Sequence, residues 1–244
     1  MKALQLHIYA VSQSFLELAK GKYLLFFIPG IVVALIFWQV YLLTETVENS
    51  FSIVERIPLI GSYFGTAVKG TFNFIQFIFD QLFIFFILTL LSPFNTILSE
   101  KIDSSITGKK YTLSFSQIIS DLFRMIFVVL LAFVLEIFTL FIYWIFSGIL
   151  NLDFVDSIAY FLIAGFFYGF SFYDYSLERH QKGIFESLKF AFSNKLLVVL
   201  SGSLFLIFYK TPVAGVIIAP VITTIITTFV YLKNQEINLV SNSI

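Results

Sequence analysis

The sequence predicts an all-α integral membrane protein with long transmembrane helices, helical hairpins that penetrate the bilayer only partly, and amphipathic interfacial helices. Of its 244 residues, 59% are hydrophobic and 12% are charged, and the mean hydropathy is +0.94. Soluble domains average about 45–50% apolar and about 25% charged residues. Apolar runs of roughly 20 residues, long enough to cross a hydrocarbon core of about 30 Å, recur along the chain. Residues 1–244 are therefore predicted to form a single membrane domain in contact with lipid.

The composition also excludes several classes of function. Lysine plus arginine equal aspartate plus glutamate, at 15 each, so no net charge favours nucleic acid as a partner. The lack of cysteine excludes disulfides, thiol catalysis and cysteine metal sites. The two histidines have no second ligand at metal-binding spacing, and catalytic or ATP-binding motifs are missing from the sequence. We expect no catalytic residues, no metal and no cofactor.

The first part of the chain is predicted to hold one interfacial helix and one membrane span. Within residues 2–20, apolar residues recur every three or four positions, which is typical of an amphipathic helix in the interface. Residues 23–43 are apolar and long enough to cross, with Pro29 in the first turns, where a missing amide is tolerated. No small-residue cleavage site follows this run, so we expect no cleaved signal peptide.

Residues 62–98 are predicted to form the long transmembrane helix around which the chain is organised. Polar residues recur along it at spacings of three and four, which places them on one helix face: Ser62, Thr66, Lys69, Asn73, Gln76 and Asp80. A carboxylate at membrane depth costs at least about 2.5–3.5 kcal/mol unless it is paired, hydrated or protonated. The stripe therefore either packs against other helices or lines a path for water or ions.

Residues 114–150 and 154–173 are predicted to form a helical hairpin. Its first helix begins at a capping-box sequence starting at Ser114. In its second helix, Gly165 and Gly169 have the spacing that lets a neighbouring helix approach closely.

Glu136 lies within the apolar part of this hairpin, on one face with Tyr143. Two interpretations apply to it, as they do to Asp80. Either acid is a proton relay or ion contact, or it is a neutral acid hydrogen-bonded to Asn73 or Tyr143. Both acids, with Tyr143, are candidates for residues along a path.

The last third is predicted to hold a second interfacial helix at residues 184–194 and a broken hairpin at 196–232. The first leg of the hairpin, residues 196–209, extends only about 21 Å as a helix, which is short of a core of about 30 Å. Pro220 favours a kink in the second leg. We expect this hairpin to be covered by other protein, because broken backbone at membrane depth needs partners.

The distribution of lysine and arginine predicts the orientation. If every apolar segment crosses the membrane, 12 of the 15 basic residues lie on one side of it. The other three, Arg56, Lys69 and Lys210, lie on the opposite side. Loops rich in lysine and arginine stay in the cytoplasm. Both termini are therefore predicted to be cytoplasmic in a multi-pass protein.

Several short motifs resemble those of the CysZ-type sulfate permeases and the related etoposide-induced protein 2.4 domain. The central one combines a Pro-Phe-Asn element, a Glu-Lys element and a helix-ending glycine. A second lies after residue 173, and a third is a pair of prolines in the last hairpin. The matching residues are Pro93, Phe94, Asn95, Glu100, Lys101, Gly108, Asp174, Tyr175, His180, Pro212 and Pro220.

The resemblance implies a homo-oligomer in the cytoplasmic (inner) membrane that takes up sulfate through two long transmembrane helices and two partly penetrating hairpins. It also implies anion binding at a glycine followed by two arginines just before the first span. Here that stretch contains the glycine but lysines in place of arginine, which offer a point charge rather than a bidentate fork. The candidate anion-binding residues are Lys20, Gly21, Lys22, Tyr23 and Leu24.

The expected function is thus a permease or channel for sulfate or a related small anion, and the alternative is a non-transporting oligomeric scaffold. Glu100 and Lys101 are expected to form a solvated pair at a helix end. Asp174, Arg179 and His180 fit either a cytoplasmic charge cluster or a folded loop.

Overall fold

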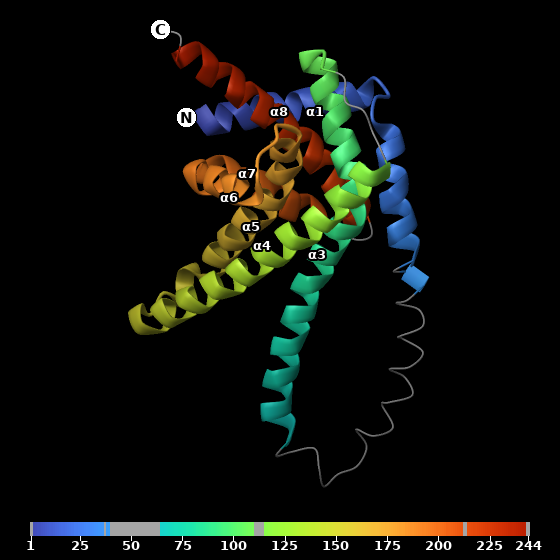
Figure 1. The fold of residues 1–244 in the computed structure, drawn as a ribbon. Helices are drawn as coiled ribbons and strands as arrows, with labels where there is room; N and C mark the ends of the chain where they lie inside the picture. The colour runs from blue at the N-terminus through green and yellow to red at the C-terminus, as the bar shows by residue number, and fades with distance from the viewer. Residues whose placement is uncertain (1, 37, 40–63, 110–114, 212–213, 243–244) are drawn as a thin grey trace.

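The computed structural model describes residues 2–36, 38–39, 64–109, 115–211 and 214–242, and the side chains of residues 64–82 lie outside that description. Every regular element in these ranges is a helix, which confirms the predicted all-α class (Figure 1). Within the described ranges, three helical stretches are long and apolar enough to cross a membrane: Phe83–Thr107, Ile119–Leu150 and Ala214–Leu239. Two bent helix pairs raise this number to five if each pair is one span. The chain is a multi-pass membrane protein.

The longest helix, α3, runs from Phe64 to Thr107 over 44 residues. The predicted end at residue 98 is wrong, because α3 continues to Thr107, nine residues farther along the chain. It stops where Gly108 takes a φ of 72°, a left-handed conformation that glycine adopts without a steric penalty. The extension matters for function, since it places Ser99, Glu100 and Asp103 on a helix that faces the bundle.

Helix α4 (Phe115–Leu150) and helix α5 (Asp156–Arg179) form a hairpin through the short 3-10 helix η3 (Asp153–Val155). Figure 1 shows its tip projecting away from the other helices. Helix α5 extends beyond the predicted end at residue 173, so the loop interpretation of Asp174 and Arg179 is wrong. The charges in this last part of α5 point into the protein rather than into water.

Two helix pairs share one L-shaped arrangement. Helix α1 (Lys2–Ala19) meets the helical stretch Leu24–Ile36, which begins with the 3-10 helix η1 (Leu24–Phe26), at 99°. Helix α6 (Ile184–Ser193) meets helix α7 (Lys195–Tyr209) at 98°. Helix α7 has 15 residues and therefore measures about 22 Å, which agrees with a leg that stops short of the far side.

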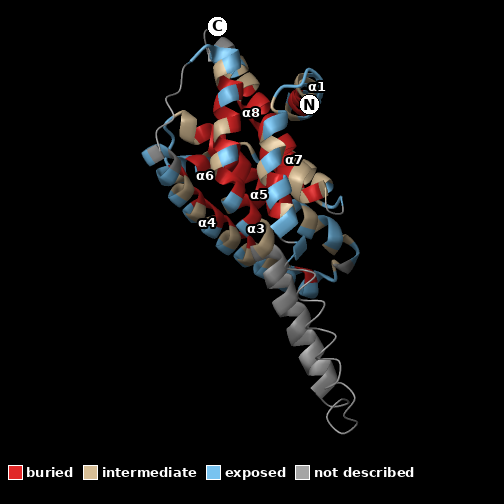
Figure 2. Ribbon diagram, turned by 90° about the vertical axis from the view of Figure 1, so that its right-hand side faces the viewer, coloured by how far each residue is buried: buried red, intermediate tan, exposed pale blue. Residues whose placement is uncertain are grey.

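The centre of the protein is the packing of α5, α7 and helix α8 (Ala214–Asn242). Figure 2 shows buried residues concentrated there, while the outer side of α4 is exposed. The spanning stretch of α8 is 78% buried and that of α4 only 28%. Helices α5 and α7 cross in backbone contact: a Cβ added to Gly202 would overlap the backbone of Gly165, and one added to Gly169 would overlap that of Val198. The glycine spacing noted in the sequence is used at this crossing.

Candidate functional site

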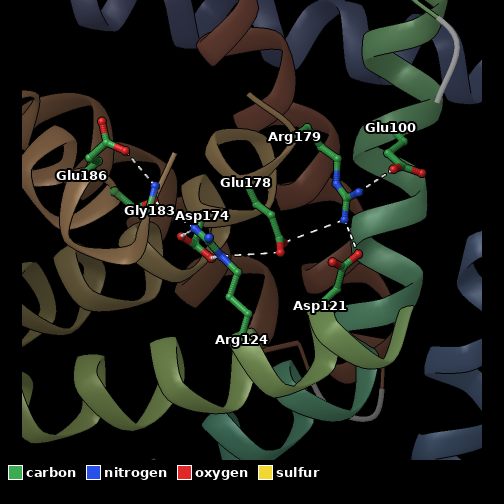
Figure 3. Close-up of polar contacts among 9 residues, drawn as sticks. Glu100, Asp121, Arg124, Asp174, Glu178, Arg179, Gly183 and Glu186 are labelled. Atoms are coloured by element: carbon green, nitrogen blue, oxygen red, sulfur yellow. Dashed lines mark hydrogen bonds and ion pairs between the residues drawn. The ribbon is translucent and has the colours of Figure 1, made fainter. Parts of the chain in front are cut away.

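Two arginines organise a buried ionic cluster at one end of the bundle (Figure 3). Arg124 comes from α4 and Arg179 from the end of α5, and their partners come from α3, α4, α5 and α6. An ion pair taken out of water is tolerated only when geometry and further hydrogen bonds compensate the lost hydration. The cluster meets this requirement because each guanidinium group has more than one acceptor.

Arg124 binds Asp174 in a bidentate manner. Its Nε donates to Asp174 Oδ2 at 3.0 Å and its Nη2 to Oδ1 at 2.8 Å. Nη2 also lies 3.4 Å from the hydroxyl of Ser187 on α6, and Nε is 3.5 Å from Glu178. Two parallel bonds to one carboxylate fix both distance and orientation. Arg124 therefore joins α4, α5 and α6.

Arg179 joins α5 to α3 and α4. Its Nη1 donates to Glu100 Oε1 at 2.6 Å, and its Nη2 pairs with Asp121. Glu178 lies between the two arginines, with Oε2 3.8 Å from Arg179 Nη2. The side chains of Arg179 and Glu100 are each 6% exposed. The predicted solvated pair of Glu100 and Lys101 is thus wrong, because Glu100 points inward to an arginine on another helix.

The cluster has more negative than positive groups. The carboxylates of Glu100, Asp103, Asp121, Asp174 and Glu178 meet two guanidinium groups and one imidazole, in which His180 Nε2 is 3.0 Å from Asp103 Oδ2. Burial, together with the negative charge of Asp121, raises the pKa of Glu178 to about 8. A site with surplus carboxylates at low dielectric repels a sulfate dianion. This arrangement is suited to clamping helices and holding a proton rather than to binding an anion.

Uncharged hydroxyl groups continue the polar core beside the cluster. The hydroxyls of Ser99, Ser176 and Thr228, from α3, α5 and α8, lie 3.0–3.4 Å apart. A second network joins α1 to the glycine crossing: His7 Nε2 lies 2.8 Å from Ser201 Oγ, which in turn lies 3.1 Å from the hydroxyl of Tyr173. The other ring nitrogen of His7 is 2.8 Å from the backbone carbonyl of Ala3. That contact favours an Nδ1–H donor, so Ser201 donates to Nε2.

Glu136 is buried in the middle of α4, and no described group replaces the hydration that its carboxyl group loses there. Its side chain is fully covered, and neither carboxyl oxygen has a hydrogen-bond partner among the side chains that the structure describes. The predicted hydrogen bond to Tyr143 is wrong, because Tyr143 donates instead to Asp156 at 2.8 Å, at the start of α5. The side chain of Asn73, the other predicted partner, lies outside the described residues.

The candidate anion-binding stretch forms the corner between α1 and the next helix. Gly21 and Tyr23 have φ values of 79° and 63°, so the chain turns sharply there. Lys20 Nζ donates to Glu17 Oε1 at 2.8 Å, and Lys22 pairs with the other oxygen of the same carboxylate. Both lysines thus already share one anionic partner, and Leu24 at the start of η1 is exposed.

The remaining predicted residues are distributed over several places. Asn95 and Pro220 are buried, Phe94 is exposed, and Lys101 Nζ lies 5.4 Å from the ring centre of Phe26. Tyr175 is buried and its hydroxyl donates to the carbonyl of Leu88 at 3.4 Å. Four further predicted residues, Lys69, Gln76, Asp80 and Pro212, have side chains that lie outside the description.

Sequence reasoning missed the cluster residues Asp103, Asp121, Arg124 and Glu178. The sequence pattern identified Arg124 only as one of the basic residues that predict the orientation in the membrane. A usable signal was present, since Asp121 and Arg124 stand one helical turn apart at the start of an apolar run. Charged residues within a membrane segment almost always face the interior of the bundle and pair with other polar groups. Within the described ranges, no three carboxylates or histidines come together as metal ligands.

Comparison with known families decides the classification. Residues 10–220 match the family described as "Sulfate transporter CysZ/Etoposide-induced protein 2.4". The chain belongs to this family. The match confirms the resemblance seen in the motifs, and it covers the chain from α1 into α8. No curated protein matches the chain. Glu100, Asp174 and His180, which carry the motif resemblance in the sequence, lie in and beside the ionic cluster.

Proposed function

We propose that the protein is a permease or channel for sulfate or a related small anion. The observation that carries the proposal is the family match over residues 10–220, whose description names a sulfate transporter. The bent helix pairs and buried polar groups support it, since transporters place broken helices and polar side chains within the membrane. We place the protein in the cytoplasmic membrane with both termini in the cytoplasm, from the bias in basic residues.

The corner at residues 20–24 is the proposed anion-binding site. Its two lysines are the nearest equivalent to the arginines that the family resemblance implies, and the glycine at position 21 is retained. Glu17 neutralises one of the two charges in the absence of substrate. Sulfate therefore competes with Glu17 for Lys20 and Lys22.

We further propose that copies of the chain assemble through the exposed side of α4. Phe138, Trp144 and Ile149 are among its exposed large side chains. Lipid or a second copy covers such a face in a membrane, and a second copy would also surround Glu136 with protein on its outer side.

Uptake of radiolabelled sulfate into proteoliposomes tests the proposal. The unmodified protein should transport sulfate, Lys22→Gln should weaken its apparent affinity, and Glu17→Gln should strengthen it by up to about fivefold, because an exposed ion pair is worth up to about 1 kcal/mol. Glu186→Gln, which removes a glutamate paired with Lys182 elsewhere, is the matched control. If well-folded, oligomeric protein transports neither sulfate nor another small oxyanion, the proposal is refuted.

The second candidate function is a non-transporting membrane scaffold. It is favoured by the surplus of carboxylates in the ionic cluster and by the pairing of both candidate lysines with Glu17. The two functions predict different results for Glu17→Gln. In a transporter the substitution strengthens the apparent affinity for sulfate, whereas a scaffold binds no sulfate and its behaviour in the assay does not change.

A further inference from the structure

A pocket of about 750 Å³ lies next to the ionic cluster, between four separate parts of the chain. Its walls come from α1, the C-terminal end of α3, the turn after α5 and the C-terminal half of α8. Figure 1 shows these elements together at the end of the molecule that carries both termini. The volume is within the range of about 300–1,000 Å³ that small-molecule sites occupy. The family resemblance gives this pocket no role.

The rim of the pocket is basic. Lys109, Lys182 and Lys233 line it, against one lining carboxylate, that of Glu236. Lys109 has no ion-pair partner among the described residues. Lys182 is 3.5 Å from Glu186, and Lys233 is 2.7 Å from Glu236, in pairs that are largely exposed. Exposed pairs are weak, so an anion with several oxygens can replace them.

Apolar and aromatic side chains also line the pocket. Tyr9, Phe229, Leu232 and Leu239 line it. The ring of His180 lies 5.0 Å from that of Tyr231. An inorganic anion gains no binding energy from contact with these apolar side chains, because removing their surface from water is favourable only when apolar atoms cover it. The pocket therefore fits an anionic group that carries an apolar part.

Helix α1 indicates how deep in the membrane the pocket lies. This helix exposes Leu4, Ile8 and Leu16, as expected of a helix whose apolar side enters the boundary between headgroups and acyl chains. Tyr9 on the same helix forms one wall of the pocket. The pocket thus lies at headgroup level on the lysine-rich side of the protein. Basic pockets between membrane helices on that side bind anionic lipid headgroups.

We propose that this pocket binds the phosphate group of an anionic phospholipid. The phosphate lies among the lysines at positions 109, 182 and 233, and the glycerol and upper acyl chain contact Tyr9 and Leu239. Such a lipid would connect α1, α3, α5 and α8 from outside the protein, next to the ionic cluster that connects α3, α4, α5 and α6 from within.

Lipid binding to the full-length protein tests the proposal. Purified protein in detergent is titrated with phosphatidylglycerol or phosphatidylcholine, and bound lipid is counted by native mass spectrometry. The pocket variant combines Lys109→Gln, Lys182→Gln and Lys233→Gln. The control combines Lys101→Gln, Lys189→Gln and Lys195→Gln, which removes the same charge from exposed positions outside the pocket. The pocket variant should bind phosphatidylglycerol at least about tenfold more weakly, because it loses all three lysines that attract the anionic headgroup.

Three further outcomes decide the proposal. Glu236→Gln, which removes the carboxylate from the pocket, should strengthen phosphatidylglycerol binding and keeps the test decisive if the triple variant folds poorly. If inorganic phosphate displaces the lipid at millimolar concentration, the pocket recognises phosphate chemistry but takes it from a soluble source. Equal weakening in the pocket and control variants, equal binding of phosphatidylcholine, or no response to Glu236→Gln would overturn the proposal.

Discussion

The two halves of α4 lie in different surroundings. In the first half, Asp121 and Arg124 are held by buried partners on α5. In the second half, Trp144 is 62% exposed, and a Cβ added to Gly148 would meet no atom within 4 Å. Glu136, between them, is buried with no hydrogen-bond partner in the described part of the chain. Buried ion pairs hold the first half to the bundle. The second half is held to α5 through the hydrogen bonds of Tyr143 and Ser147 to Asp156, and much of its apolar surface is left for lipid or another copy of the chain.

This difference shows which charges the fold needs. An ion pair between helices that is buried on both sides stabilises the fold only while both partners are present. An unpaired buried carboxyl lowers stability and is retained where function requires it. Four experiments test this comparison.

Loss of Arg179 should have the largest effect. Arg179→Gln leaves Glu100 and Asp121 buried without their cation, which typically costs about 3–5 kcal/mol. The free energy of unfolding, measured by denaturant titration in detergent, should fall by that amount. Lys189→Gln, at an exposed position, should change it by less than about 0.5 kcal/mol. Equal stability of the two variants would show that the cluster is not a clamp.

The two glycine environments should respond differently to the same added methyl group. Gly202→Ala forces α5 and α7 apart and should lower the free energy of unfolding by about 1–3 kcal/mol. Gly148→Ala meets open space and removes a helix-weakening glycine, so stability should stay equal or rise by up to about 1 kcal/mol. A loss for Gly148→Ala in the oligomer but not in the monomer would place a second copy against α4.

Replacement of Glu136 by an apolar residue should stabilise the protein. Glu136→Leu removes a buried acceptor without a partner, whose burial costs about 1–3 kcal/mol. Under the proposed function, sulfate uptake should fall in the same variant. Lower stability together with unchanged uptake would mean that Glu136 has a structural partner and no role in transport.

The effect of pH is the smallest of the four when it is taken per unit of pH. The pKa of Glu178 is raised from its ordinary value of 4.5 to about 8, so the folded protein binds more protons than the unfolded chain between these values. The free energy of unfolding should therefore fall as pH rises through this window, by at most about 1.4 kcal/mol per pH unit. Unfolding curves of Glu178→Gln, recorded from pH 5 to 8, should have a smaller slope. Glu186→Gln, at an exposed helix start, should retain the full slope.

The helices could be predicted from the sequence, but the ionic cluster could not. Apolar runs and spacing located the interfacial helix near residue 184 and the short leg that follows it, because these signals are local. Pairing between helices is not local: Arg179 meets Glu100 79 residues away, and His7 meets Ser201 194 residues away. The predicted transmembrane helix stopped at residue 98 because polar residues follow there, whereas α3 continues to Thr107, since partners on other helices take up its buried polar side chains. The stripe from Ser62 to Asp80 remains a prediction.

The two L-shaped helix pairs limit how the protein can move. Under the predicted interfacial position of α6, α7 cannot rotate about its own axis without lifting the apolar side of α6 into water. The same holds for α1 and the helical stretch that follows it. The hydrogen bond between His7 on one L and Ser201 on the other couples the two pairs. We therefore expect a tilt of one L to favour a tilt of the other.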